Sequence, residues 1–138
     1  MFLRLLATLT VSVSLVAAMP VPAGVPLAPG VPSAQPPAMK ARYDHAKWTY
    51  PGPEAIAEAY PRRAQDQRIQ GVAAVTCYIS PDGQMSKCLL LGENPPREGF
   101  GDATVTLFTK YGRVDPATVD GGIQDGDFKV FTLNWQIN

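Results

Sequence analysis

Two apolar-rich runs on either side of a short turn sequence form the clearest pattern in the chain. Residues 72–79 and 85–91 each place apolar side chains at alternate positions, as a β-strand with a buried face does. Between them, residues 80–83 read Ser-Pro-Asp-Gly, a proline-led turn that ends in glycine. The pattern therefore predicts a β-hairpin at the centre of the fold.

The two cysteines of the chain face each other if this hairpin is centred on the Asp82–Gly83 bond. Residue i then pairs with residue 165 − i, so that Cys77 meets Cys88, at a separation compatible with a disulfide. A type I turn with a glycine bulge would instead shift the sum to 164 and set Cys77 against Lys87. Mid-strand cysteines lack the Cys-x-x-Cys context of a redox pair, so we expect a structural disulfide rather than a thiol oxidoreductase.

The second face of the hairpin is also apolar. Leu89 and Leu91 lie opposite the Cys77 face, where a solvent-facing strand would carry polar side chains. This excess of apolar side chains predicts either a bulge in the strand or an additional cover over that face.

A helix is predicted over residues 100–111. Ala103 and Leu107, with Phe108 or Tyr111, recur at three- and four-residue spacing and should face inward. Threonines in this segment are weak helix formers, so the helix depends on packing against the rest of the domain.

A last strand is predicted over residues 128–136. One face carries Phe128, Val130, Thr132, Asn134 and Gln136, and the other carries Lys129, Phe131, Leu133, Trp135 and Ile137. The second face is the apolar one. The order β-β-α-β, with a short helical lead-in around residues 54–68, indicates an α+β domain: a three-stranded antiparallel sheet with one main helix packed on one face.

The N-terminus predicts export. Residues 1–18 combine a short basic start, an apolar stretch and small residues before a cleavage point after Ala18, as a signal peptide does. An uncleaved anchor is the alternative, although a transmembrane helix needs about 20 apolar residues and prolines begin at Pro20. Residues 19–52 then form a Pro-rich linker and lead-in, and residues 53–138 the folded domain. The Pro-rich part is interpreted as a polyproline II spacer or an unstructured tail.

Charge and candidate chemistry exclude several functions. The chain has 12 Lys+Arg and 12 Asp+Glu, with no basic stripe, so nucleic acid is not expected as a partner. The single histidine, His45, lies in the lead-in and is interpreted as a solvated loop residue. No nucleophile with its base, no phosphate-binding glycine loop and no spaced ligand set occurs, so we expect no enzyme activity, no metal and no cofactor.

Several short motifs, taken in order, resemble the C-terminal domain of TonB energy transducers over residues 60–137. They are Tyr60-Pro61-Arg62-Arg63-Ala64, Arg68-Ile69-Gln70-Gly71, Pro81-Asp82-Gly83, Gly99-Phe100-Gly101-Asp102-Ala103 and Arg113-Val114-Asp115-Pro116 with Asp120-Gly121. The chain departs from the family at Gly112-Arg113-Val114, where members usually carry an aromatic-Arg-aromatic run.

This resemblance implies a periplasmic domain, or an inner-membrane anchored one facing the periplasm. It implies that the last strand adds an extended peptide of an outer-membrane receptor, in TonB-dependent transport or as a detached binding module. The implied peptide-binding residues are Phe128, Lys129, Val130, Phe131, Thr132 and Leu133, with Tyr60 and Arg113 nearby. The alternative is a small secreted, disulfide-stapled structural or interaction protein without a transport role, which would form a homodimer through its sheet edge.

Overall fold

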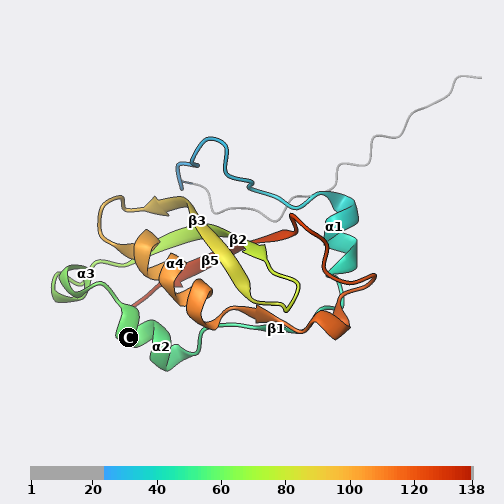
Figure 1. The fold of residues 1–138 in the computed structure, drawn as a ribbon. Helices are drawn as coiled ribbons and strands as arrows, with labels where there is room; N and C mark the ends of the chain where they lie inside the picture. Colours follow the sequence, from blue (N-terminus) through green and yellow to red (C-terminus); the bar gives the residue numbers. More distant parts are fainter. Residues whose placement is uncertain (1–23, 138) are drawn as a thin grey trace, which may run out of the picture.

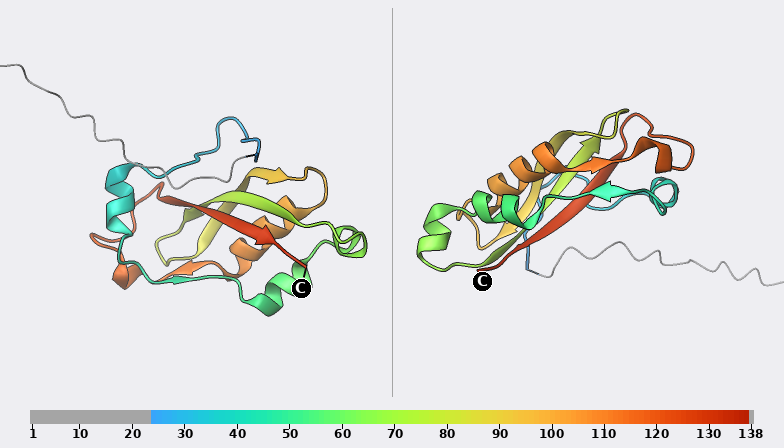
Figure 2. Two further views of the ribbon diagram at one scale, coloured as in Figure 1. Left: turned by 180° about the vertical axis from the view of Figure 1, so that it is seen from behind. Right: turned by 90° about the horizontal axis from the view of Figure 1, so that it is seen from below.

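The computed structural model describes residues 24–137, which build a three-stranded antiparallel sheet with one long helix against it (Figure 1). β2 (Gly71–Ile79) is the central strand, and β3 (Met85–Asn94) and β5 (Phe128–Trp135) flank it. The helix α4 (Phe100–Tyr111) follows β3 in the chain and covers one face of the sheet, as two further views show (Figure 2). The predicted α+β fold is confirmed.

The smaller elements surround this sheet. They are α1 (Pro37–Arg42), β1 (Trp48–Thr49), α2 (Pro53–Ala59), α3 (Arg62–Asp66), β4 (Arg113–Val114) and a single 3-10 turn, η1 (Pro116–Thr118). β1 and β4 form a two-stranded antiparallel pair that the sequence pattern did not predict.

The core lies between α4 and the sheet. Phe108 of α4 stacks on Phe131 of β5, with ring centroids 4.4 Å apart, and Val75 of β2 lies in the same cluster. α4 has the predicted limits, and Leu107 and Phe108 are buried as expected, whereas Ala103 is only half-buried. Three buried residues of the helix were not predicted, namely Phe100, Gly101 and Thr104.

The hairpin combines both predicted registers. Cys77 pairs with Cys88 and is bonded to it, which confirms the disulfide and the sum of 165 at that point. Next to the turn, however, Ile79 pairs with Met85 instead of Ser86, because Gly83 adopts a positive φ of 85° and shortens the loop by one residue. Ser86 is then the extra residue of a bulge, and the sum returns to 165 from Tyr78 to Val75. A second register shift raises it to 166 from Ala74 onward, where the predicted sum of 165 is wrong.

The proline-rich residues 24–36, here named the proline cover, lie across the sheet face opposite α4. Thr76 of β2, fully buried on that face, donates its hydroxyl to the Pro32 carbonyl at 2.5 Å. The Ala28 amide donates to the carbonyl of Leu91, the extra residue of a second bulge in β3. The bulge and the cover expected from the apolar outer face are therefore both present, and residues 24–36 are a packed segment rather than a spacer or an unstructured tail.

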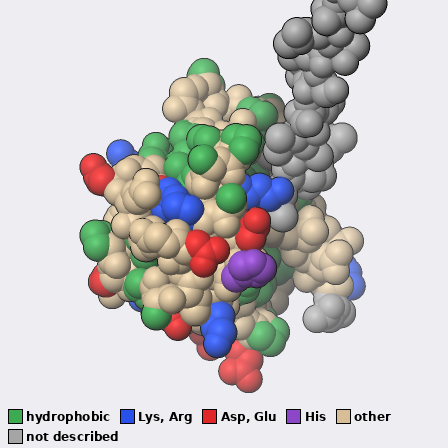
Figure 3. All heavy atoms as spheres, turned by 90° about the vertical axis from the view of Figure 1, so that its right-hand side faces the viewer, with side chains coloured by type: hydrophobic (Ala, Val, Ile, Leu, Met, Phe, Trp, Pro, Cys, Tyr) green, Lys and Arg blue, Asp and Glu red, His purple; other side chains and the backbone are tan. Residues whose placement is uncertain are grey.

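The lead-in also packs on the domain. Tyr43 is buried in the core cluster that contains Phe131, and Trp48 meets the Phe131 ring edge-on at 5.8 Å. His45 is exposed in the turn after α1, and Figure 3, in which histidine is purple, shows a face of interspersed acidic and basic side chains around it. Within residues 24–137, no three metal-ligating side chains gather into a possible metal site.

None of the helices described between residues 24 and 137 has the length and apolar character needed to cross a membrane. The signal peptide or anchor predicted for residues 1–18 lies outside the described residues.

Candidate peptide-binding edge

β5 forms one edge of the sheet, because it pairs with β2 on one side and the described strands offer no partner on the other. The Ile79 amide donates to the Asp127 carbonyl at 2.9 Å, so the backbone carbonyl of Asp127 faces β2. In an antiparallel ladder, residues two apart direct their backbone groups to the same side. The odd-numbered residues therefore face β2, and the even-numbered Phe128, Val130, Thr132 and Asn134 direct their N–H and C=O groups outward.

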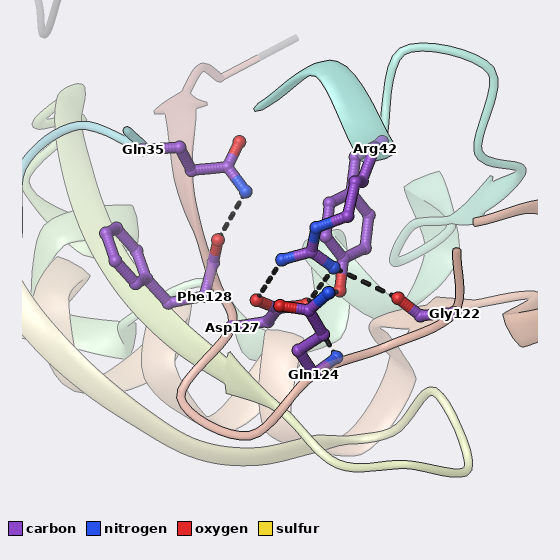
Figure 4. Close-up of polar contacts among 7 residues, drawn as sticks. Gln35, Arg42, Gly122, Gln124, Asp127 and Phe128 are labelled. Carbon is purple, nitrogen blue, oxygen red and sulfur yellow. Dashed lines mark hydrogen bonds and ion pairs between the residues drawn. The ribbon is translucent and has the colours of Figure 1, made fainter. Parts of the chain in front are cut away.

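An ion pair ties the lead-in to the start of β5 (Figure 4). Arg42 donates through Nη1 and Nη2 to the two carboxylate oxygens of Asp127, at 2.7 and 2.6 Å. The Tyr43 hydroxyl and the Gln124 amide donate to the same carboxylate, at 2.7 and 2.9 Å. Burial alone would raise the pKa of Asp127, but these hydrogen bonds and the guanidinium charge hold it below its ordinary value. The carboxylate is therefore ionised, and it fixes α1 beside the strand.

The first outward carbonyl of β5 already has a partner. Gln35, the last but one residue of the proline cover, donates its Nε2 to the Phe128 carbonyl at 2.5 Å (Figure 4). The remaining outward groups are the Phe128 N–H and the N–H and C=O groups of Val130, Thr132 and Asn134. The Thr132 and Asn134 side chains are exposed, so this part of the edge is accessible.

The other residues of the predicted peptide-binding set point to the α4 side of the sheet. The Lys129 ammonium lies 4.8 Å from the centre of the Trp48 ring and 5.9 Å from that of Phe131. Burial, with a smaller contribution from Lys40, lowers the pKa of Lys129. Phe131 and Leu133 pack in the core, so their side chains shape the sheet and do not line its outer edge.

Tyr60 and Arg113 lie in separate parts of the domain. Tyr60 is buried, where its hydroxyl donates to the Ile69 carbonyl at 2.6 Å and its ring meets Trp135 at 90°. Burial raises the pKa of Tyr60. Arg113 lies in β4, opposite Thr49 of β1. The structure thus places Tyr60 against the far end of β5 and Arg113 in the small two-stranded pair.

Three residues near the edge were not among those predicted. Asn134 follows Thr132 on the same side of β5, and the alternation of the strand already contained this signal. Tyr50 is 53% exposed and meets Phe131 edge-on at 6.0 Å, so it offers an aromatic surface beside the edge. Gln35 bonds to a residue 93 positions away, and no local pattern in the sequence marks such a contact.

Comparison with known families agrees with this geometry. The family described as Gram-negative bacterial TonB protein C-terminal matches residues 57–137, from the end of α2 through β5. No curated protein matches the chain. Domains of this family are non-enzymatic, act in TonB-dependent transport in the periplasm and interact with outer-membrane receptors. The match covers more than half of the sequence, and the chain therefore belongs to the TonB C-terminal domain family.

Proposed function

We propose that the β5 edge binds an extended peptide of an outer-membrane receptor by strand addition, in TonB-dependent transport or as a detached binding module. The observation that carries this proposal is the row of outward backbone groups at Val130, Thr132 and Asn134 on an exposed strand edge. Opposite residues 130–134, this edge accommodates a peptide segment of about five residues.

Backbone hydrogen bonds supply most of the affinity in this mode, and nearby side chains supply the selection. Thr132 and Asn134 are the exposed polar side chains on the strand, and Tyr50 is the exposed aromatic side chain beside it. The disulfide, one strand away at Cys77 and Cys88, keeps β2 and β3 in register and so supports the strand on which the edge depends.

The test uses the isotope-labelled full chain and synthetic peptides with receptor TonB-box sequences, followed by amide chemical shifts. We expect shifts at Val130, Thr132 and Asn134 on addition of peptide. Thr132→Pro should abolish binding, because it removes an outward N–H while leaving the pairing with β2 intact. Thr132→Ala is the matched control, since it changes the side chain and keeps the N–H. The absence of shifts at millimolar peptide, or binding by Thr132→Pro at the affinity of the unmodified protein, would contradict the proposal.

The same open edge favours a second candidate, self-association of a secreted interaction protein. Two β5 strands placed side by side would form a continuous six-stranded sheet, because each copy contributes three strands. Sedimentation at increasing concentration distinguishes the two functions: a dimer that Thr132→Pro dissociates, together with no affinity for the peptides, would support self-association alone.

A further inference from the structure

The proline cover crosses the sheet from one edge to the other. It begins at β3, where the Ala28 amide donates to the Leu91 carbonyl at 2.6 Å. It passes β2, where the Thr76 hydroxyl holds the Pro32 carbonyl, and it ends at β5, where the Gln35 side chain holds the Phe128 carbonyl. The segment therefore contacts all three strands, and its last contact lies on the candidate peptide-binding edge.

The covered face is built to accept a close-lying chain. Ala74 and Thr76 are fully buried beneath it. A Cβ atom added at Gly92 would lie 2.2 Å from the Pro26 carbonyl oxygen and 2.4 Å from Cγ1 of Val25, so only glycine leaves room there. A proline-rich chain has few N–H groups to satisfy but keeps its carbonyls, and the buried hydroxyl of Thr76 supplies a donor for one of them.

We propose that the proline cover is an intramolecular gate on strand addition, with Gln35 as its latch. The inference rests on the proposed function of the β5 edge. Since Gln35 occupies the Phe128 carbonyl, an incoming peptide finds its first free outward carbonyl at Val130 while the cover is docked. Release of Gln35 frees the Phe128 position and lengthens the available edge by one pair of residues.

Gln35 lies close to a second contact, which anchors α1 to the residue before β5. The cover continues directly into α1, which Arg42 fastens to Asp127, the residue before Phe128. Gln35 and Arg42 therefore bracket the start of β5 (Figure 4). Because Arg42 keeps α1 in place, the latch can open by movement of Gln35 and the cover alone, without unfolding the sheet or the lead-in.

The affinity for a receptor TonB-box peptide tests the gate. We expect Gln35→Ala to bind the peptide about two- to tenfold more tightly than the unmodified full chain. In the unmodified chain the peptide must first displace one neutral hydrogen bond, and the loss of one such bond weakens affinity by about this factor. It should also extend the chemical shift changes to Phe128. Ser33→Ala, at an exposed position two residues earlier in the cover, is the matched control and should leave the affinity unchanged. Peptide binding of equal strength in Gln35→Ala and the unmodified chain overturns the gate and leaves the proposed function standing.

A measurement without peptide decides whether the cover is docked. The Gln35 side-chain amide protons should resonate away from those of a free glutamine and exchange slowly with solvent. Thr76→Val, which removes the donor to Pro32, should move them toward free values. Free-glutamine resonances in the unmodified chain would overturn the gate whatever the peptide does. If the latch is docked but neither the unmodified chain nor Gln35→Ala binds peptide, the proposed function fails, and the gate fails with it.

Discussion

The indole Nε1 of Trp135 donates a hydrogen bond of 2.9 Å to the Thr104 hydroxyl, and neither side chain is exposed to solvent. The hydroxyl in turn donates to the Phe100 carbonyl one turn back in α4, at 2.7 Å. Thr104 thus satisfies the polar atom of the largest side chain in the core, and this contact fastens α4 to the end of β5.

Thr104→Val should lower the free energy of unfolding by about 1–3 kcal/mol, because it leaves the Trp135 N–H buried without an acceptor. Thr104→Ser keeps the hydroxyl, so its free energy of unfolding should fall by less than that of Thr104→Val. Urea unfolding followed by tryptophan fluorescence measures both. A smaller loss in Thr104→Val than in Thr104→Ser would show that the methyl group, and not the hydrogen bond, matters at this position, because valine keeps the methyl group and serine removes it.

Removal of the disulfide should destabilise the domain by about 3 kcal/mol, since Cys77 and Cys88 close a loop with a sequence separation of 11. The double variant Cys77→Ala/Cys88→Ala tests this by urea unfolding, with the reduced unmodified protein as its comparison. The free energies of unfolding of the double variant and of the reduced unmodified protein should agree to within about 1 kcal/mol. Unchanged stability in both would mean that strand pairing alone holds the hairpin.

The Asp127 carboxylate should contribute stability that depends on pH. Its pKa is lower in the folded protein than its ordinary value of 3.8, so the contribution is complete above that value and is lost as pH falls through the lowered pKa. Asp127→Asn should cost about 2–3 kcal/mol at neutral pH, because Arg42 and Tyr43 lose a charged partner. The difference between the two proteins should shrink below pH 4.

Asp125→Asn is the matched control for this experiment, because Asp125 lies exposed in the same loop. It should unfold like the unmodified protein at every pH. A difference between Asp127→Asn and the unmodified protein that stays constant from pH 7 to pH 2 would contradict an ionised, hydrogen-bonded carboxylate.

Gly92→Ala should displace the start of the proline cover, because the new methyl group would overlap Val25 and Pro26. Overpacking of this kind costs about 1–3 kcal/mol where the neighbours cannot move. Hydrogen exchange at the Ala28 amide should accelerate, while the β2 amides stay protected. Gly52→Ala, a position with open space around it, is the control. Unchanged protection of Ala28 would contradict the close packing of the cover on β3.

Most of the sheet was predictable because its signals are local. The alternation in β5, the turn at residues 80–83 and the spacing in α4 each lie within a dozen residues, and the elements formed where these patterns indicated. The register next to the turn could not be predicted from the turn residues, since a turn that ends in a glycine with positive φ is compatible with a pairing sum of 164 or 165. The strand pair contains both sums, 164 at Ile79 and 165 at Cys77.

The candidate site was predictable only in part. The alternation of β5 predicted the strand and its two faces. The family resemblance, however, placed Lys129, Phe131 and Leu133 in the same peptide-binding set as the edge residues, although their side chains lie on the α4 face. The proline cover had only an indirect signal, the apolar outer face around Leu89 and Leu91. Its partners are 44 to 93 positions away in sequence, and composition alone resembles that of a linker.

The contacts of the proline cover also set an order of folding. Its three anchoring partners, Leu91, Thr76 and Phe128, belong to three different strands, so the surface that it needs exists only once β2, β3 and β5 have paired. The hairpin can form early from neighbouring residues, and β5 must then join across more than thirty residues of chain. Of the described part of the chain, the segment nearest the N-terminus is therefore synthesised first and docks last.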